Sequence, residues 1–360
     1  MAEQTHHEEV NKKMTVKLRE VRKELPPFTN SFFSAFENTT TILTRFNYAI
    51  DLRIFFQFLT SETPYFSGKK ILDISADDLK EITIDDLYLF LDYLSLYARP
   101  SHQDDDASSG GGQEQFLENH AHGKARKVAC LRSFFKHYYK KGILKENICQ
   151  LLDTPKINEK PIVRLEPNEV AALLDIVENG ENLTNRQKQF HKKNVLRDMA
   201  IFILFLTTGI RVSELVAINI SDIDFNANSF RITRKGGNQV LLYFDTETEA
   251  ALQNYLEERK TQGTYALASP LFLSMQGKRI SVRAVENLVK KYTRLAAPLK
   301  KISPHKLRST YGTMLYQETG DIYLVADVLG HKDVNTTKKH YAAMSEENRK
   351  RASKAVKLRE

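Results

Sequence analysis

The sequence predicts a mainly α-helical protein with one small β-sheet, divided into two domains. Its 360 residues exceed the roughly 150 residues of an ordinary single domain. Apolar residues recur at helical spacing through most of the chain, and one pair of segments, 230–233 and 240–244, alternates as paired strands do. We therefore expect helices in both domains and the sheet in the second domain.

The first domain is expected over residues 28–153, after an N-terminal extension of residues 1–27. The extension is polar and mixes Glu with Lys, which excludes a signal peptide. Its His6–His7 pair is interpreted as part of a disordered segment. Two apolar stretches with helical spacing follow, at residues 44–59 and 79–97, and we predict a helix for each.

Residues 101–123 interrupt the helical pattern of the first domain. They contain DDD and SSGGG and no Lys or Arg, so we expect a flexible, acidic insert. A helix is predicted at 124–145, with eight basic residues and no acidic one. Such a helix is equally compatible with a solvated surface and with a face that contacts phosphates. The candidates for contacts to a phosphate backbone are Lys124, Arg126, Lys127, Arg132 and Lys136.

A linker with three prolines is expected at 154–167, and the second domain at 168–360. Gly209 is expected to end one helix and Arg211 to begin the next. The two strands are joined by RKGGNQ, a hairpin with glycine at its tip. The other predicted helices of this domain are 168–177, 194–206, 250–262, 281–295, 305–319, 322–329 and 336–344.

Charge is distributed unevenly along the chain. Residues 1–155 contain 20 Lys and Arg against 22 Asp and Glu, the remainder contains 33 against 23, and the net charge is +8. The basic second half favours a polyanionic partner, although many proteins of other classes are equally basic. Cys130 and Cys149 lack the spacing of a disulfide framework or a zinc site. No apolar run approaches the roughly 20 residues that cross a bilayer, so we expect a cytosolic protein without a membrane partner.

The second domain contains the residue types that break a phosphodiester without a metal. This reaction needs a nucleophile, cationic donors for the non-bridging oxygens and an acid for the leaving oxygen. Arg211 follows TTG at a predicted helix start, where backbone amides also favour an anion. His305 and Arg308 follow Pro304, which favours a helix start, and their i,i+3 spacing places both on one helical face.

Three further candidates are Lys235 at the hairpin tip, His331 at a helix end and Tyr341 ten residues later. Each candidate has an ordinary structural explanation when it is considered alone. Arg211 could be a surface residue, the histidines could cap helix ends, Tyr341 could belong to the core and Lys235 could be a solvated turn residue. The ordered combination is what favours catalysis.

The order TTGIRVSEL, a Lys-bearing hairpin, HKLR, LGH and TTKKHY resembles the catalytic domain of the tyrosine recombinase (phage integrase) family. The match covers about residues 165–345, and the helical first domain resembles the family's core-binding domain more weakly. The resemblance implies the two-domain tyrosine recombinase architecture, a helical core-binding domain plus an α+β catalytic domain. The length and the acidic insert favour the Xer branch, which resolves chromosome dimers before cell division.

The resemblance also implies a role for each candidate. Tyr341 would attack the scissile phosphorus and form a 3′-phosphotyrosyl link. Arg211 and Arg308 would hold the non-bridging oxygens, for which a guanidinium suits phosphate better than an ammonium group. Lys235 would protonate the departing 5′ oxygen. No cofactor and no metal are implied, because the phosphotyrosine retains the bond energy.

Three residues have supporting roles in this scheme. His305 would help to remove the tyrosine proton, and His331 would donate a hydrogen bond to the phosphate. Glu214, in the family's RxxEL pattern, would support Arg211 rather than take part in the chemistry. The sequence departs from the family in one spacing, since Tyr341 lies ten residues after His331 where nine is usual.

The family's exchange of four strands implies a homo-oligomer, with a dimer on each double-stranded DNA site and a tetramer in the synapse. In the family a C-terminal helix docks on a neighbouring subunit, and residues 345–360 are long enough for this, although they could instead be a basic tail lying on DNA. The two domains would clamp the duplex. A DNA translocase is left open as a further partner.

Four other interpretations remain open from the sequence. The chain could be the integrase of a mobile element, a type IB topoisomerase or a non-catalytic DNA-binding protein of the same fold. Residues 1–27 are too short for the arm-binding domain that integrases often carry, which favours the Xer interpretation. A metal-dependent nuclease is disfavoured, because Asp104, Asp105 and Asp106 lie in the expected flexible insert.

Overall fold

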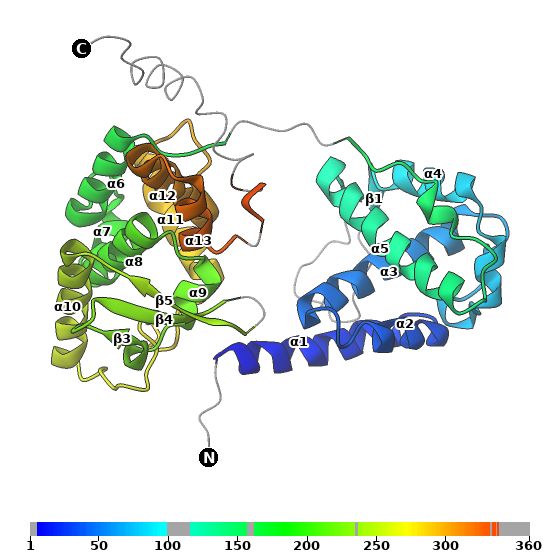
Figure 1. Cartoon of the computed structure of the whole chain (residues 1–360), viewed down its shortest axis with the longest axis horizontal. Coiled ribbons are helices and arrows are strands. Elements are labelled where there is room, and N and C mark those ends of the chain that lie inside the picture. Colours follow the sequence, from blue (N-terminus) through cyan, green and yellow to red (C-terminus); the bar gives the residue numbers. More distant parts are fainter. Residues whose placement is uncertain are drawn as a thin grey trace, which may run out of the picture. The chain divides into compact units, whose positions relative to one another are not determined.

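The computed structural model describes residues 6–98, 116–156, 162–234, 237–331, 333–335 and 337. Over these residues it confirms a mainly helical fold with small antiparallel sheets (Figure 1). The chain divides into two compact units, Met1–Glu159 and Lys160–Glu360, each of which is described by itself. Lys235, Tyr341, the tail at 345–360 and most of the helix predicted at 336–344 lie outside the described residues.

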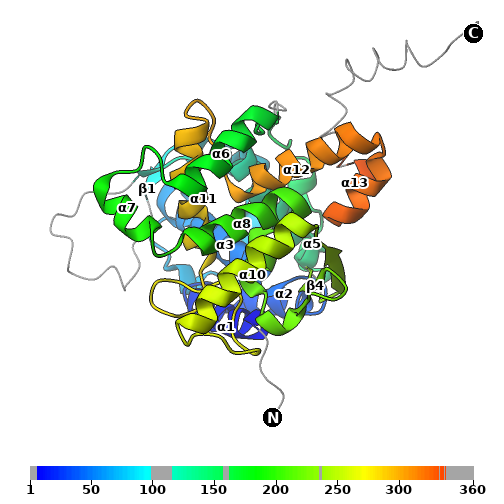
Figure 2. The same cartoon turned by 90° about the vertical axis from the view of Figure 1, so that its left-hand side faces the viewer.

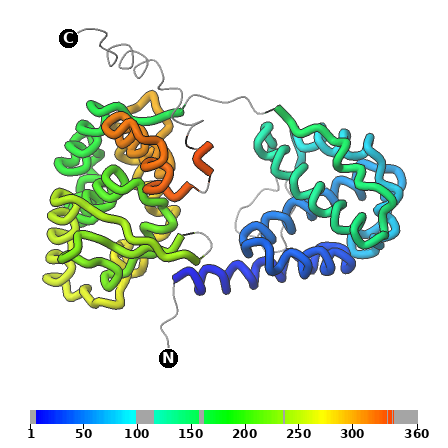
Figure 3. The backbone as a smooth tube through the Cα atoms, viewed as in Figure 1, coloured from blue at the N-terminus to red at the C-terminus, as the bar shows by residue number. Residues whose placement is uncertain are grey.

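The first unit is a bundle of helices around an aromatic core. Its helices are α1 (His6–Lys23), α2 (Asn30–Ala35), α3 (Ile42–Glu62), α4 (Ile84–Tyr93) and α5 (Ala121–Lys140). Helix α1 packs along α3, as the tube in Figure 3 shows, so the His6–His7 pair begins a helix and the expectation of disorder there is wrong. The fully buried rings include Phe32, Phe55, Phe56, Phe90 and Phe134.

Two boundaries in the first unit differ from the prediction. Strand β1 (Tyr97–Ala98) pairs with β2 (Phe116–Leu117), and α5 begins at Ala121, so residues 116–123 are not part of a structureless insert. Helix α5 ends at Lys140 rather than at 145, because Gly142 turns the chain with a φ of +72°. The helix predicted at 79–97 is the shorter α4, which begins at a capping box formed by Thr83 and Asp86.

The second unit is built around α8 (Val195–Thr208), an apolar helix that Figure 2 shows between α6 (Pro167–Asn179) and α10 (Thr246–Thr261). Helices α11 (Val282–Ala296) and α12 (Pro304–Thr319) complete the core, and α13 (Ile322–Leu329) packs on α12. The short helices are α7 (Asn185–His191), which was not predicted, and α9 (Val212–Ala217). No helix of the described ranges is long and apolar enough to span a bilayer.

The sheet of the second unit has three strands instead of the two that were predicted. Its order is β3 (Ile223–Asp224), β4 (Ser229–Thr233) and β5 (Gln239–Tyr243), with both pairings antiparallel. The β4–β5 register pairs Phe230 with Leu242, and both side chains are buried. The short β3 carries too few residues for its alternation to be recognised from the sequence.

Candidate active site

Gly209 and Glu214 position Arg211 between α8 and α9. Gly209 ends α8 with a φ of +60°, and a Cβ at this position would lie 2.4 Å from Tyr311 Cδ1, so only glycine fits there. The chain then turns and Arg211 becomes the N-cap residue of α9. Its backbone N–H donates to Glu214 Oε2 at 3.0 Å, and its Nη1 donates to Glu214 Oε1 at 2.8 Å. The buried Glu214 carboxylate thus fixes both the backbone and the guanidinium of Arg211.

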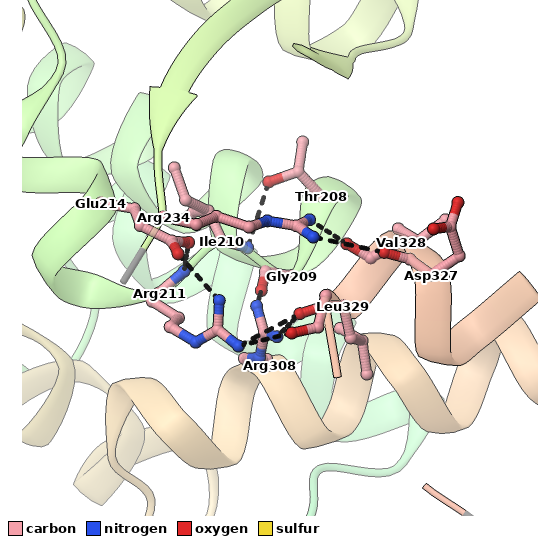
Figure 4. A network of polar contacts seen from close by, with 11 residues as sticks. Thr208, Gly209, Ile210, Arg211, Glu214, Arg234, Arg308, Asp327, Val328 and Leu329 are labelled. Carbon is pink, nitrogen blue, oxygen red and sulfur yellow. Dashed lines mark hydrogen bonds and ion pairs between the residues drawn. The ribbon is translucent and has the colours of Figure 1, made fainter. Parts of the chain in front are cut away.

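Arg308 joins Arg211 at the C-terminal end of α13 (Figure 4). It is 5% exposed, and its Nη1 donates to the Gly209 carbonyl at 2.5 Å while its Nη2 donates to the Leu329 carbonyl. Arg211 Nη2 donates to the same Leu329 oxygen at 3.3 Å and to the Gly330 oxygen at 3.2 Å. Two guanidinium groups that are 97 positions apart in the chain therefore meet at one carbonyl oxygen.

Helix chemistry explains why arginines gather at this point. The last carbonyls of a helix lack partners within the helix, and the helix dipole makes that end negative. Helix α13 has no basic residue of its own in its last turn. A third guanidinium, that of Arg234, donates to the Val328 carbonyl at 2.9 Å and to the Asp327 carbonyl at 3.5 Å. Arginines from elsewhere in the chain thus donate hydrogen bonds to the last carbonyls of α13 and place positive charge at its negative end.

Arg234 was not among the candidates, yet strand periodicity could have found it. Side chains at every second position of a strand point to the same face. Phe230 and Ile232 of β4 are buried, and Arg234 continues that inward series while Thr233 is exposed. The sequence pattern therefore places Arg234 toward the body of the domain.

The two histidines occupy different environments. The His331 backbone N–H donates to the Ala326 carbonyl at 2.9 Å, and its Nδ1 lies 2.7 Å from the hydroxyl of the buried Thr337. His331 follows Gly330, which ends α13 with a φ of +62°, so His331 belongs to the turn that Arg211 contacts. His305 lies in the first turn of α12, one turn before Arg308, and is exposed.

The candidate cations of α5 in the first unit are held by internal contacts to different degrees. Lys136 is exposed, and Lys124 donates to the Ser95 hydroxyl at 2.7 Å. Arg132 donates to the Cys149 carbonyl at 3.2 Å and to the Leu152 carbonyl at 2.5 Å. Arg132 therefore fastens α5 to the segment that leads out of the first unit.

Lys127 and Arg126 form an ion-pair cluster with Asp51 of α3. Lys127 is 3% exposed, and its Nζ lies 3.4 Å from Asp51 Oδ1, while the half-exposed Arg126 donates to Asp51 Oδ2. Burial raises the pKa of Asp51 and lowers the pKa of Lys127, and the ion pair opposes both changes. Lys127 is thus buried against Asp51 instead of facing the solvent, where a phosphate backbone would have to lie.

Comparisons with known proteins identify the family of this chain. The model of the phage integrase family matches residues 163–348. The chain is 33% identical over 299 residues to a tyrosine recombinase XerC of Caldanaerobacter subterraneus subsp. tengcongensis, covering 81% of this chain and 75% of the relative. It is 28% identical over 355 residues to a tyrosine recombinase XerS of Lactococcus lactis subsp. cremoris, covering 92% of this chain and 96% of the relative.

Solved structures show the same fold at lower identity. A XerH recombinase bound to palindromic difH substrate matches with a TM-score of 0.58 and 19% identity, over 83% of this chain and 75% of that chain. The Tn1549 transposon integrase in complex with a circular intermediate DNA matches with a TM-score of 0.60 and 15% identity, over 89% and 98%. The chain belongs to the phage integrase family. It is a tyrosine recombinase, an enzyme of site-specific DNA recombination.

Proposed function

We propose that this recombinase cleaves and rejoins double-stranded DNA through a 3′-phosphotyrosyl intermediate on Tyr341. The Tyr341 oxygen forms a bond to the scissile phosphorus as the bond from phosphorus to the 5′ oxygen breaks. Lys235 gives a proton to that 5′ oxygen, and His305 helps to remove the proton of the tyrosine. The number of phosphoester bonds does not change, so the scheme needs no ATP and no metal.

The observation that carries this proposal is the convergence of Arg211 and Arg308 on one carbonyl oxygen beside His331. Their N–H groups donate to backbone carbonyls, and the non-bridging oxygens of a phosphate are acceptors of the same kind with a full negative charge. A guanidinium donates to such oxygens through its fork of N–H groups. We propose that these arginines stabilise the charge of the pentavalent phosphorus, with His331 as a further donor and Glu214 holding Arg211 in place.

The DNA duplex would also be bound outside the active site. The exposed Lys136 and the partly exposed Lys124 and Arg126 on α5 are the residues we propose for phosphate contacts by the first unit. Such contacts carry little sequence information and make binding depend steeply on salt. The +10 net charge of residues 156–360 supports DNA binding by the second unit as well.

The biological reaction we propose is the resolution of chromosome dimers before cell division, which implies a cytoplasmic location. The similarity to a tyrosine recombinase XerS over 96% of its length supports this assignment. Integration of a mobile element is the second candidate, supported by the match to the Tn1549 transposon integrase over 98% of that chain. The two candidates differ in their end product. Dimer resolution converts a circular DNA dimer with two directly repeated sites into monomers, whereas integration joins one DNA molecule to another.

We further propose that the protein acts as a homo-oligomer, a dimer on each site and a tetramer in the synapse. Exchange of four strands needs four nucleophiles, and each chain supplies one Tyr341. Residues 345–360 would dock on a neighbouring subunit and determine which tyrosines are active. We propose a DNA translocase as the activator of this assembly.

The experiment that tests the chemistry is covalent trapping. A library of nicked duplexes, from which the cleaved end diffuses away, is incubated with the protein, and adducts that survive denaturation are mapped. We expect adducts at one sequence with the wild type and none with Tyr341→Phe. Arg308→Lys is expected to lower the cleavage rate by about 10²-fold or more, because an ammonium group cannot replace the fork. Equal adduct yield from Tyr341→Phe would refute the proposal.

A further inference from the structure

Arg234 connects the β4–β5 hairpin to the C-terminal end of α13. Its side chain donates to the Val328 carbonyl at 2.9 Å and to the Asp327 carbonyl at 3.5 Å (Figure 4). Its backbone N–H donates to the Asn238 carbonyl at 2.8 Å, and its carbonyl accepts from the Gly237 N–H at 3.0 Å. One residue thus closes the turn of the hairpin with its main chain and contacts α13 with its side chain.

The contact between Arg234 and α13 is close. A Cβ built on Gly330 would lie 1.9 Å from Arg234 Nη1 and 2.3 Å from its Cζ. The guanidinium therefore lies directly on the glycine that ends α13, in space that every other residue type would fill. Gly330 also has a φ of +62°, which side-chain-bearing residues rarely adopt.

Arg234 does not resemble a solvated surface arginine. It is partly buried, and its Nε is buried with no hydrogen-bond partner among the described residues. Burial lowers the pKa of its guanidinium below the ordinary value, and the neighbouring Arg211 acts in the same direction. A partly buried cation next to another cation is unfavourable by itself, and the carbonyls of α13 and the charge of Glu214 offset this cost.

The position of Arg234 in the chain links it to two proposed site residues. Lys235 is the next residue after Arg234, and consecutive Cα atoms are about 3.8 Å apart. His331 is the next residue after Gly330, on which the guanidinium lies. A contact between Arg234 and Gly330 therefore fixes the main chain immediately next to both.

We propose that Arg234 is a positioning residue for strand cleavage, which holds the base of the β4–β5 hairpin on the C-terminal end of α13 and so places Lys235 to protonate the leaving 5′ oxygen. This inference rests on the proposed function of the site. Arg234 itself neither donates the proton nor binds the phosphate. It fixes the position of the hairpin base relative to the turn that carries His331.

The test uses two DNA substrates that differ in one atom. The first has the natural bridging 5′ oxygen at the mapped cleavage site, and the second has sulfur there. Oxygen leaves as an alkoxide unless it receives a proton, whereas a thiol has a pKa of about 8.5 and its sulfur leaves as a thiolate without one. A variant that has lost proton delivery is therefore slow on the first substrate and close to wild type on the second.

The expected results concern single-turnover cleavage by the full-length protein. Arg234→Ala should be about 10²-fold slower than wild type on the oxygen substrate and within about threefold on the sulfur substrate. Lys235→Ala should show the same pattern, since it removes the proposed acid. Arg231→Ala is the matched control, because Arg231 is an exposed arginine of β4, the strand that Arg234 directly follows, and it should behave like wild type on both substrates. Arg234→Lys should be intermediate, because an ammonium group cannot reach both carbonyls equally well.

Three outcomes would overturn the proposal. An equal loss on both substrates would mean that Arg234 does not act through the leaving group. Weaker DNA binding with a smaller salt dependence would mean that Arg234 contacts a phosphate directly. If Arg234→Ala fails to fold, Arg234→Lys is measured in its place. A ratio of the cleavage rates on the sulfur and oxygen substrates that is the same for Arg234→Lys as for wild type would then refute the proposal. Failure of the proposed function itself would be seen separately, as the absence of a Tyr341-dependent adduct with the wild type.

Discussion

Replacing Gly330 with alanine separates the cost of a backbone conformation from the loss of the Arg234 contact. Two glycines of the second unit end helices in the left-handed region, Gly320 after α12 with a φ of +67° and a ψ of 0° and Gly330 after α13 with a φ of +62° and a ψ of +49°. A Cβ on Gly320 meets no atom within 4 Å, whereas a Cβ on Gly330 would lie 1.9 Å from Arg234 Nη1. Gly320→Ala is therefore a matched control for the backbone term.

The magnitudes follow from these contacts. A side chain in the left-handed region costs about 1–2 kcal/mol, which both substitutions share. Gly330→Ala must also displace the guanidinium, and hydrogen bonds from a charged donor contribute roughly 1.5–3 kcal/mol each. Since Arg234 is only partly buried, we take about 1–3 kcal/mol for both bonds together. We expect a total of about 2–5 kcal/mol for Gly330→Ala against about 1–2 kcal/mol for Gly320→Ala.

The assay is a double-mutant cycle measured by urea unfolding. In an Arg234→Ala background no guanidinium remains to be displaced, so Gly330→Ala should cost only the backbone term. The expected coupling between the two substitutions is about 1–3 kcal/mol. Additivity within about 0.5 kcal/mol would show that the contact between Gly330 and Arg234 contributes nothing to stability, and this would refute the reasoning.

Two further predictions concern other parts of the chain. Truncation after Met344 should weaken tetramer assembly by about tenfold or more while binding to a single DNA site is retained, as measured by mobility shift; full tetramer formation would exclude docking of the tail. Lys127→Met should cost about 3–5 kcal/mol at pH 7, because it leaves the buried Asp51 carboxylate poorly compensated. Burial already raises the pKa of Asp51, and removing Lys127 raises it further. The folded variant therefore holds a costly buried carboxylate at pH 7, and protonation relieves this cost as the pH falls. The loss of stability caused by Lys127→Met should thus be smaller at pH 5 than at pH 7. Urea unfolding at both pH values checks this, with the exposed Lys136→Met as control, and an equal cost at both pH values would contradict it.

Helix periodicity and glycine chemistry made most of the second unit predictable. Helix α8 ends at Gly209 as predicted, and α13 ends at the predicted Leu329, before Gly330. Both glycines adopt the left-handed conformation that is common after a helix end. The sequence order of Arg211, Arg308 and His331 identified segments that the fold brings together. The partner that joins them, the carbonyl end of α13, was not predictable, because backbone acceptors carry no residue-type signal.

The basic helix α5 shows where charge counting was insufficient. The eight Lys and Arg of the helix predicted at 124–145 were treated as one set, yet helical periodicity places Lys127 on the same stripe as the buried Leu131 and Phe134. A lysine on that stripe needs a buried carboxylate, and Asp51 lies within the apolar stretch of α3. Both residues could have been paired from their positions, whereas their contact across 76 positions depends on tertiary packing.

The end of α13 has a consequence for catalysis that the individual contacts do not show. Three guanidinium groups in one site repel one another, and a flexible arginine loses side-chain entropy when it is fixed. The carbonyls of α13 and the Glu214 carboxylate offset the repulsion and hold Arg211, Arg234 and Arg308 without a phosphate. The repulsion and the loss of side-chain entropy are therefore offset when the protein folds and not when DNA binds. Donors that are ordered in advance in this way are what electrostatic stabilisation of a transition state requires. On the proposed mechanism, the carbonyls that order the arginines make both the stability of α13 and the rate of strand cleavage depend on this one helix end.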